Sequence, residues 1–343
     1  MKFLTATSMG LYRRAIAVVA AIIMVASVVS VAGAPKAEAA NRDWLRPDAT
    51  GHCTWDSVGW WVQRCDVWSE SMGRTIPVQI QPAKRGGNAG LYLLDGLRAT
   101  GKTNAWVNDV NAARLYEPHN ITLVMPVGGA GSFYADWNGP ATYDLGQSVN
   151  YQWETFLTQE LKGYVQRQFG VSPTNNSIAG LSMGGTAAIT LAGKHNDQFR
   201  QALSYSGYLA TSMPGAQTLM RLALLDAGGF NLNAMYGSMI NPRRFENDPF
   251  NQIGNLRNTD VYVSAASGIP GAVDANYPWN LAISGAILEA VALTTTRLWD
   301  TKARAMGVNF TADYPATGLH NWAQFGGQLS KTKNRVLDVM NAW

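Results

Sequence analysis

The sequence is poor in cysteine and histidine, which account for 2 and 4 of its 343 residues. No Cys/His group has the spacing of a zinc site, so a structural zinc domain is excluded and no metal is expected. Cys53 and Cys65 lie close together, and export of the chain would favour a disulfide between them. We interpret His52, beside Cys53, as a chance neighbour and not as half of a ligand pair.

Charged residues are also scarce, at 15%, and the excess of basic residues is confined to the N-terminus. Without residues 1–40 the chain has 23 basic and 22 acidic residues. A near-neutral chain without runs of like charge lacks the electrostatic footprint of a nucleic-acid-binding protein and has no polybasic membrane patch. We therefore expect no nucleic-acid partner and a substrate that is not a polyanion.

One long uncharged run, residues 15–34, follows Lys2, Arg13 and Arg14. An Ala-Glu-Ala site at 37–39 comes next, and this order of segments is typical of a secretory signal peptide. The run is almost long enough for a membrane anchor, which is the alternative. The cleavage site favours residues 1–40 as a signal peptide, so the protein is expected to be secreted or to reside in the cell envelope.

Residues 41–343 contain no Pro-, Ser- or Gly-rich linker and are expected to form one domain. We interpret the tryptophan-rich part, 41–70, as an N-terminal extension packed on the core, with a sugar-binding platform as the alternative. Beyond it, short apolar runs alternate with longer segments of helical periodicity. Strands are predicted at 76–80, 91–94, 121–125, 177–181, 202–205, 261–265 and 309–314, and helices at 105–115, 152–169, 184–195, 217–225, 279–306 and 322–340.

This alternation predicts the α/β class, with a mainly parallel sheet covered by helices on both faces. Residues 208–257 interrupt the alternation and are rich in Gly, Asn, Met and Pro. We expect them to be an insertion over the C-terminal edge of the sheet, where ligands bind in such folds. A lid, an acyl-chain channel and a purely structural excursion are all compatible with this composition.

The pattern Gly-x-Ser-x-Gly at 180–184 is the strongest functional signal in the chain. It follows an apolar strand-like run and precedes a helix-like run, the context in which this pattern presents a nucleophilic serine on a sharp turn. Glycines beside the serine allow the strand and the helix to approach each other closely. Ser182 is therefore the candidate nucleophile.

A nucleophilic serine needs a histidine base, which a carboxylate must orient. In α/β-hydrolases the chain order is Ser, Asp/Glu, His, and only His195 and His320 follow Ser182. His195 ends the helix that begins at Ser182 and is carried away from it, which favours a surface or C-cap role. His320 lies in a loop between the last strand and the last helix, so it is the candidate base.

Four carboxylates are candidates for the third position: Asp274, Glu289, Asp300 and Asp313. Asp300 and Asp313 fit a helix face and a strand better than a catalytic loop. Topology favours Asp274, which follows a strand directly, but the residues alone do not decide between it and Glu289.

The tetrahedral intermediate of acyl transfer also needs two backbone donors for its oxyanion. In this class one donor is the amide after the nucleophile, which is that of Met183 here. The other belongs to the loop after an early strand, where the amide of Leu97, or that of Arg98, is the natural candidate.

Seven motifs run in order through nearly the whole chain after the leader, and with the residues above they resemble the antigen 85 family of mycolyltransferases. Within it they resemble the secreted corynomycolyltransferases of the corynebacterial type. The motifs are SMGR (71–74), YLLDGLRA (92–99), MPVGG (125–129), SFYADW (132–137), WETFL (153–157), GLSMGG (180–185) and GLHNW (318–322). The resemblance implies an α/β-hydrolase fold and a triad of Ser182, Glu289 and His320, which favours Glu289 over Asp274. It also implies that the amides of Leu97 and Met183 bind the oxyanion.

The same resemblance implies a reaction. A mycolyl or corynomycolyl group moves from trehalose monomycolate to a second trehalose monomycolate or to cell-wall arabinogalactan through an acyl-serine intermediate, and no cofactor or metal is required. The enzyme is expected to be a monomer that touches envelope lipid peripherally. The residues implied to bind trehalose are Asp95, Arg98, Asn108, Asp109 and Trp322.

The sequence departs from the mycobacterial members in its tryptophan-rich extension with two cysteines, in the stretch 104–109, and at Asn321, where a serine is usual. These differences bear on the acceptor and leave the triad intact. The alternatives are a secreted carboxylesterase of the esterase D-like group, with water as acceptor, and a non-catalytic surface binding protein.

Overall fold

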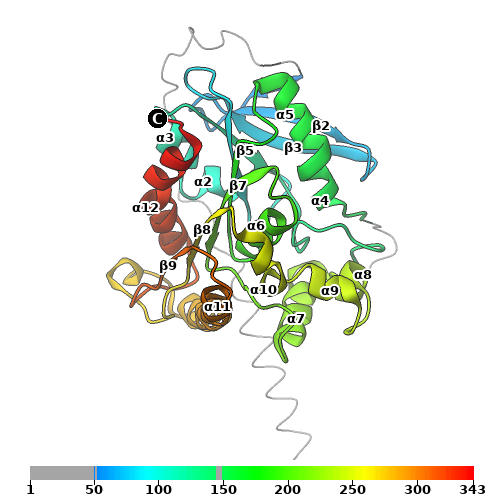
Figure 1. Ribbon diagram of the computed structural model, residues 1–343, viewed down its shortest axis with the longest axis vertical. Coiled ribbons are helices and arrows are strands. Elements are labelled where there is room, and N and C mark those ends of the chain that lie inside the picture. Colours follow the sequence, from blue (N-terminus) through cyan, green and yellow to red (C-terminus); the bar gives the residue numbers. More distant parts are fainter. Residues whose placement is uncertain (1–49, 51, 144–148) are drawn as a thin grey trace, which may run out of the picture.

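The computed structural model describes residues 50, 52–143 and 149–343, so the predicted signal peptide lies outside the described residues. A nine-stranded sheet with helices on both faces forms the centre of the described chain (Figure 1). Its strand order is β1-β2-β3-β5-β4-β6-β7-β8-β9. The predicted α/β class is therefore confirmed.

All seven predicted strands are present, and two further strands precede them. The strands are β1 (Cys53–Trp55), β2 (Gln63–Ser69), β3 (Arg74–Gln81), β4 (Ala89–Leu94), β5 (Ile121–Pro126), β6 (Asn176–Leu181), β7 (Phe199–Tyr205), β8 (Asp260–Ser264) and β9 (Thr311–Asp313). Pairs from β5 to β9 along the sheet are parallel, whereas β1, β2 and β3 pair antiparallel and β3 joins β5 antiparallel.

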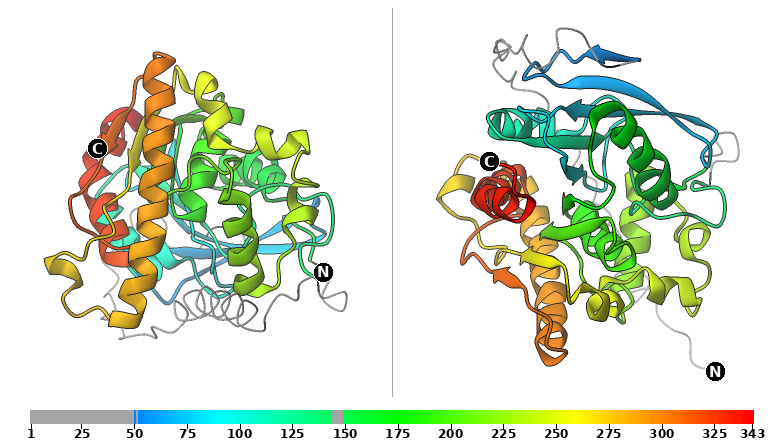
Figure 2. Two further views of the ribbon diagram at one scale, coloured as in Figure 1. Left: turned by 90° about the horizontal axis from the view of Figure 1, so that it is seen from below. Right: turned by 45° about the horizontal axis from the view of Figure 1, so that its top comes forward.

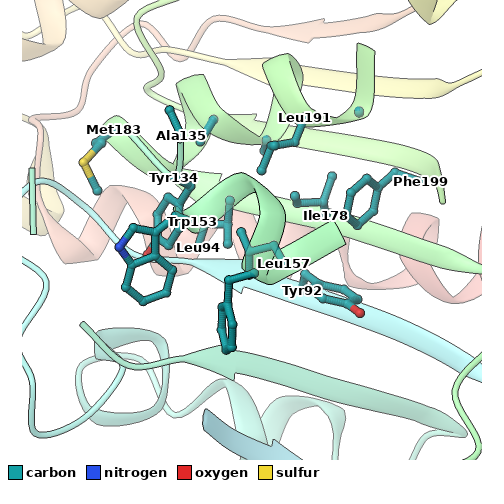
Figure 3. Close-up of a cluster of buried hydrophobic side chains, with 14 of the residues drawn as sticks. Tyr92, Leu94, Tyr134, Ala135, Trp153, Leu157, Ile178, Met183, Leu191 and Phe199 are labelled. Carbon is teal, nitrogen blue, oxygen red and sulfur yellow. The ribbon is translucent and has the colours of Figure 1, made fainter. Parts of the chain in front are cut away.

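Side chains of the central strands alternate between two buried faces, as a sheet covered on both sides requires. In β4, Tyr92 and Leu94 belong to one hydrophobic cluster, and Leu91 and Leu93 belong to the other. Figure 3 shows Tyr92 and Leu94 among the aromatic and aliphatic side chains of the first cluster. Helices α5 and α6 cover this face, and α3 and α12 cover the opposite one (Figure 1).

The helices are more numerous than predicted. They are α2 (Ala105–Asn108), α3 (Ala112–Tyr116), α4 (Trp153–Thr155), the π-helix η3 (Phe156–Glu160), α5 (Leu161–Phe169), α6 (Met183–Lys194), α7 (Ala216–Gly228), α8 (Leu232–Tyr236), α9 (Pro242–Glu246), α10 (Pro249–Gln252), α11 (Trp279–Ala305) and α12 (Trp322–Met340), with 3-10 turns η4 (Ile253–Leu256) and η5 (Ala272–Asp274). Figure 2 shows α11, in orange, as the longest of them.

Two of the predicted helices are interrupted. The segment 105–115 breaks at Asn111, which has a φ of 50° and whose side chain accepts a hydrogen bond from the Arg114 N–H to cap α3. Asparagine tolerates this left-handed conformation better than most residues. The segment 152–169 contains the π-helix η3 between α4 and α5.

The segment 208–257 contains four short helices, α7 to α10, of which only α7 was predicted. Asp248 fixes its beginning because its carboxylate accepts the backbone N–H groups of Thr211 and Ser212. The salt bridge between Asp226 of α7 and Arg98 joins the segment to the loop after β4. The insertion is therefore tied to the carboxyl edge of the sheet.

Part of the tryptophan-rich segment, expected as an extension, belongs to the sheet. β1 and β2 (blue in Figure 2) pair antiparallel at one edge, next to β3. Cys53 lies opposite Cys65 in this pairing, and the two form the predicted disulfide. Trp55 and Trp68 remain exposed.

The disulfide closes a loop between cysteines 12 residues apart, so it constrains the unfolded chain. We predict that replacing Cys53 and Cys65 together by alanine lowers the free energy of unfolding by about 2–3 kcal/mol. Guanidinium denaturation of the two proteins measures this difference. Reduced wild-type protein should unfold at the midpoint of the double variant, and a difference below about 0.5 kcal/mol would contradict the prediction.

Candidate active site

Ser182 occupies the turn between β6 and α6 and is the N-cap residue of α6. Its backbone has φ 52° and ψ −121°, a conformation that non-glycine residues rarely adopt, and the residue is 8% exposed. A Cβ on Gly180 would overlap the carbonyl group of Gly184, and a Cβ on Gly184 would overlap the carbonyl oxygen of Asp95. The surrounding packing thus holds Ser182 in its strained turn.

His320 and Glu289, which lie 31 residues apart in the chain, meet in the structure. His320 Nδ1 is 2.8 Å from Glu289 Oε2, and the Glu289 side chain is fully buried. Glu289 Oε1 accepts hydrogen bonds from Ser206 Oγ and from the Ala266 N–H, both at 2.7 Å. Both oxygens of this buried carboxylate therefore have partners, as a buried charge requires.

The His320 side chain is 8% exposed and is held by contacts on several sides. Its backbone N–H donates to the Gly285 carbonyl of α11, the helix that also carries Glu289. The ring of Phe325 meets the imidazole edge-to-face at 5.0 Å, and the ring of Tyr208 lies 5.9 Å away at an interplanar angle of 31°. These contacts restrict the rotation of the imidazole.

Asp274, the carboxylate that topology favoured, is buried but is engaged with other residues. Its Oδ1 accepts a hydrogen bond from Asn321 Nδ2 at 2.7 Å, and its Oδ2 accepts one from the Gly271 N–H at 2.8 Å. Asn321 also caps α12 by accepting the Gln324 N–H. Asp274 and Asn321 together fix the loop beside His320, and the imidazole itself pairs with Glu289.

The other two candidates lie on α11 and β9, as expected. Asp300 binds Arg304 on the same helix, and Asp313 binds Lys331 of α12.

The predicted oxyanion residues lie in two segments that touch at the contact between Gly184 and Asp95. Met183 is the first residue of α6, so its N–H has no acceptor within the helix. In the described part of the chain, no protein acceptor is bonded to the N–H of Leu97 or Met183. The Leu97 carbonyl accepts the Gly131 N–H at 2.9 Å, which fixes this loop. Two available amides are what an oxyanion hole requires.

Two of the implied sugar ligands are already engaged by the protein. Asp95 is buried, and its carboxylate accepts the N–H groups of Gly96 at 3.0 Å and Ala105 at 2.9 Å. Burial raises the pKa of Asp95 to about 6, against the lowering effect of these bonds. Arg98 pairs with Asp226, a partner that no sequence motif indicates.

The remaining implied sugar ligands lie at α2 and at the start of α12. Asn108 and Asp109 are exposed at the end of α2, and burial of part of the carboxyl group raises the pKa of Asp109. Trp322 begins α12, and its ring meets that of Trp106 in α2 edge-to-face at 5.4 Å. The structure thus brings these two elements together.

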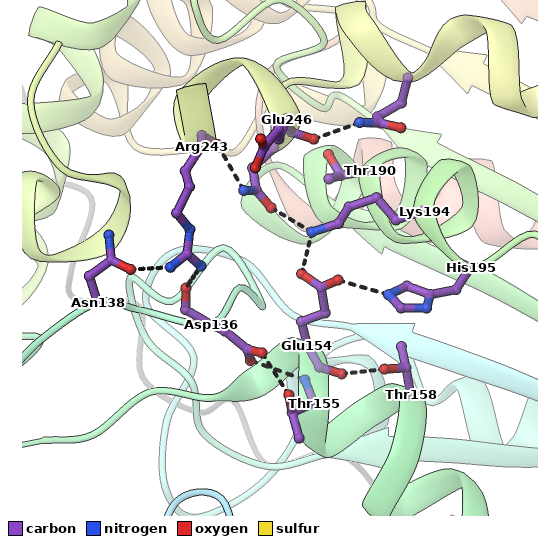
Figure 4. Close-up of polar contacts among 12 residues, drawn as sticks. Asp136, Asn138, Glu154, Thr155, Thr158, Thr190, Lys194, His195, Arg243 and Glu246 are labelled. Carbon is purple, nitrogen blue, oxygen red and sulfur yellow. Dashed lines mark hydrogen bonds and ion pairs between the residues drawn. The ribbon is translucent and has the colours of Figure 1, made fainter. Parts of the chain in front are cut away.

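His195 belongs to a separate polar cluster (Figure 4). It is the C-cap residue of α6, and its Nε2 is 2.8 Å from Glu154 Oε1. Lys194 lies 2.6 Å from the other carboxylate oxygen and also donates to Asn247. Although burial acts to raise the pKa of Glu154, the bonds from His195 and Lys194 lower it overall. This histidine therefore has a structural partner, and it is distinct from the candidate base.

The parts of the site follow the carboxyl ends of neighbouring parallel strands. The loop with Leu97 follows β4, Ser182 follows β6, Ser206 follows β7, Ala266 follows β8, and His320 comes after β9. Ligands bind at this edge in open α/β sheets. Within residues 50, 52–143 and 149–343, no group of three His, Cys, Asp or Glu side chains is arranged to hold a metal ion. The residues available for chemistry suit nucleophilic acyl transfer.

A mainly parallel sheet with its serine on a strand–turn–helix, and with an acidic residue and a histidine later in the chain, defines the α/β-hydrolase fold. The crystal structure of Mycobacterium tuberculosis MPT51 (FbpC1) is similar, with a TM-score of 0.71 and 29% identity over 81% of this chain and 98% of that one. FphF, a fluorophosphonate-binding serine hydrolase of Staphylococcus aureus, shares the fold at a TM-score of 0.61 and 16% identity, covering 80% and 97% of the two chains.

Sequence similarity assigns the chain to one family within this fold class. Residues 69–336 match the family described as "Putative esterase". The chain is 37% identical to Ag85C of Mycobacterium leprae over 82% of both chains, and 38% identical to Ag85A of Mycobacterium tuberculosis H37Rv over the same shares. Ag85B of Mycolicibacterium smegmatis is 36% identical over 92% of both. The chain therefore belongs to the Ag85 family of diacylglycerol acyltransferase/mycolyltransferases.

The raised pKa of Asp95 makes stability depend on pH. An unfolded aspartate titrates near pH 4. The folded protein holds this proton up to about pH 6, so the contribution of Asp95 to stability is lost as pH rises from about 4 through 6. We predict that wild-type protein loses about 2–3 kcal/mol relative to Asp95→Asn between pH 4 and pH 7. Urea denaturation at a series of pH values tests this, and parallel stability curves for the two proteins would contradict it.

Proposed function

We propose that this protein is a secreted acyltransferase that moves a mycolyl group, of the corynomycolyl type, from trehalose monomycolate to a second trehalose monomycolate or to arabinogalactan. The observation that carries the proposal is the buried pair of Glu289 and His320, 2.8 Å apart, at the sheet edge where Ser182 caps α6. The predicted leader supports secretion. The Ag85 relatives, named as diacylglycerol acyltransferase/mycolyltransferases, support the reaction class.

In the proposed reaction Ser182 Oγ attacks the ester carbonyl of the donor while His320 Nε2 takes its proton. The amides of Leu97 and Met183 donate to the oxyanion that develops on the carbonyl oxygen. His320 returns the proton to the departing trehalose oxygen, which leaves an acyl group on Ser182. Glu289 fixes the tautomer of His320 and stabilises the imidazolium. No cofactor or metal takes part.

The second half repeats these steps with a sugar hydroxyl as the nucleophile. His320 takes the proton of the acceptor hydroxyl, the new ester bond forms, and the Ser182 oxygen leaves with the returned proton. Asp95, Arg98, Asn108, Asp109 and Trp322 are the proposed trehalose ligands. Since Asp95 and Arg98 already bind the Ala105 N–H and Asp226, their contacts to sugar would require rearranging these bonds. The acting species is proposed to be a monomer.

Exposed apolar side chains support a lipid substrate. Leu219, Leu222 and Leu225 are exposed along α7, and Ile283 and Ile287 are exposed on α11. An acyl chain or the surface of envelope lipid could cover such side chains, which otherwise face water. Shielding of the acyl-enzyme from water by the 208–257 segment would favour transfer over hydrolysis.

The second candidate is a secreted carboxylesterase, which the "Putative esterase" family match favours. It would use the same residues with water as the acceptor. A non-catalytic binding protein would have no use for a buried carboxylate bonded to His320. Burying the Glu289 carboxylate is costly unless it is fully hydrogen-bonded.

The products distinguish these functions. We predict that purified protein incubated with trehalose monomycolate forms trehalose dimycolate faster than free mycolic acid, as measured by thin-layer chromatography. Ser182→Ala should reduce product formation at least about 1,000-fold, because the nucleophile is lost. Ser172→Ala, at a partly exposed serine after α5, serves as the matched control and should keep wild-type activity. Release of free acid alone at saturating donor would overturn the transferase proposal, and full activity in Ser182→Ala would overturn both enzyme functions.

A further inference from the structure

Tyr208 interacts with both residues that carry the proposed chemistry, Ser182 and His320. It follows β7 by three positions, in the segment that also supplies Ser206 to Glu289. Its ring is 5.9 Å from the His320 ring, and the two planes are inclined by 31°. The Ser182 side chain acts on the Tyr208 hydroxyl as a hydrogen-bond partner that lowers the pKa of the phenol, against the larger raising effect of burial. Neither the sequence motifs nor the proposed mechanism uses this residue.

Thr186 fixes Tyr208 relative to Ser182. Thr186 Oγ1 accepts the Tyr208 N–H at 2.9 Å and lies 3.3 Å from the Tyr208 carbonyl oxygen. The same Oγ1 lies 3.2 Å from the Ser182 carbonyl oxygen, and the Thr186 N–H donates to that oxygen at 3.0 Å. Tyr208 and the nucleophile are therefore bonded to the same residue of the first turn of α6.

The backbone of Gly207, the residue before Tyr208, is also fixed by its contacts. The Gly207 carbonyl accepts a hydrogen bond from Thr296 Oγ1 of α11 at 3.2 Å. A Cβ on Gly207 would overlap Ser204 Oγ and would come within 2.9 Å of the Gly185 carbonyl carbon, so β7, α6 and this turn are closely packed. The phenol ring is thus presented by a rigid turn, which is what a residue that orients a nucleophile needs.

The charge state of the phenol suits a donor. Burial raises the pKa of Tyr208 far above its ordinary value, so the group is a neutral phenol at neutral pH. A neutral phenol can donate its proton to one lone pair of Ser182 Oγ. In the proposed arrangement the phenol takes the donor role in this pair, so that the serine proton is directed to His320 and the second lone pair of Ser182 Oγ is left for attack on the substrate.

We propose that Tyr208 is a positioning residue for the nucleophile: its hydroxyl holds Ser182 Oγ in the rotamer that faces His320, and its ring limits rotation of the imidazole. The inference rests on the proposed assignment of Ser182 as nucleophile. Without the phenol hydroxyl, Ser182 Oγ samples its other staggered rotamers, and the fraction of molecules ready for attack falls.

A fluorophosphonate probe tests the inference without any need for the natural substrate. Labelling forms a bond between Ser182 Oγ and phosphorus, breaks the phosphorus–fluorine bond, and releases fluoride while the serine proton passes to His320. Tyr208→Phe removes one hydroxyl group and keeps the ring. We expect the second-order labelling rate to fall about two- to tenfold, the effect of losing one neutral hydrogen bond.

A pH profile and a matched variant separate positioning from general damage. In Tyr208→Phe the plateau of the labelling rate should fall while the midpoint of its pH dependence stays, since Glu289 and His320 are unchanged. With p-nitrophenyl butyrate as substrate, Tyr208→Phe should have a lower kcat and an unchanged KM. Tyr314→Phe loses a phenol bond to the Asp300 carboxylate, at 2.8 Å on another part of the chain, and should label at the wild-type rate.

Variants at Thr186 give a second route that leaves Tyr208 in place. Thr186→Val removes the oxygen that fixes Tyr208 and should lower the labelling rate, whereas Thr186→Ser, which keeps an oxygen, should lower it less. In the Tyr208→Phe background, Thr186→Val should add little, because both changes remove the same constraint.

The outcomes distinguish this inference from the proposed function. If wild-type protein is not labelled on Ser182, the nucleophile assignment fails and the inference fails with it. If wild-type protein is labelled and Tyr208→Phe is labelled equally fast, or the effects of Thr186→Val and Tyr208→Phe simply add, the role of Tyr208 is refuted alone.

Discussion

The buried carboxylate of Glu289 is the constraint on which the site depends. An ionised carboxylate without partners costs several kcal/mol in a protein interior, so every group that bonds it is held in place by that cost. Its donors come from the ends of three strands: Ser206 after β7, Ala266 after β8 and His320 after β9. Because Glu289 lies on α11, one side chain fixes the long helix, the sheet edge and the histidine loop relative to one another.

The fold was predictable from the sequence where hydrophobic periodicity was strong. The buried parallel strands and α6, α11 and α12 are close to their predicted positions, since both faces of the sheet are apolar. Shorter elements were missed because local chemistry, and not periodicity, defines them. Asn241-Pro242 and Asp248-Pro249 are cap-and-proline starts of α9 and α10, and these signals were present in the sequence. β2 depends on pairing with β3, and β1 depends on pairing with β2, which no local pattern reveals.

The site was predictable to a different extent at each residue. The turn chemistry of Gly-x-Ser-x-Gly identified Ser182 from its neighbours, and elimination left His320. The residues alone did not decide between Asp274 and Glu289. In the structure both side chains are buried near the histidine loop, and the carboxylate of Glu289 is the one that lies 2.8 Å from His320 Nδ1. Tyr208 gave no signal, since an aromatic residue after a strand is usually a core residue, and its role emerges only when the rings and hydroxyl groups are seen together.

Intact-protein mass spectrometry after brief exposure to trehalose monomycolate tests the central claim most directly. Our account predicts a mass increase equal to the acyl group, located on Ser182 by peptide mapping and removed when a fresh trehalose acceptor is added. Glu289→Gln should form the adduct much more slowly, because the imidazole loses the charge that stabilises its protonated form. An adduct on another residue, or turnover with no acyl group ever bound to Ser182, would contradict the account.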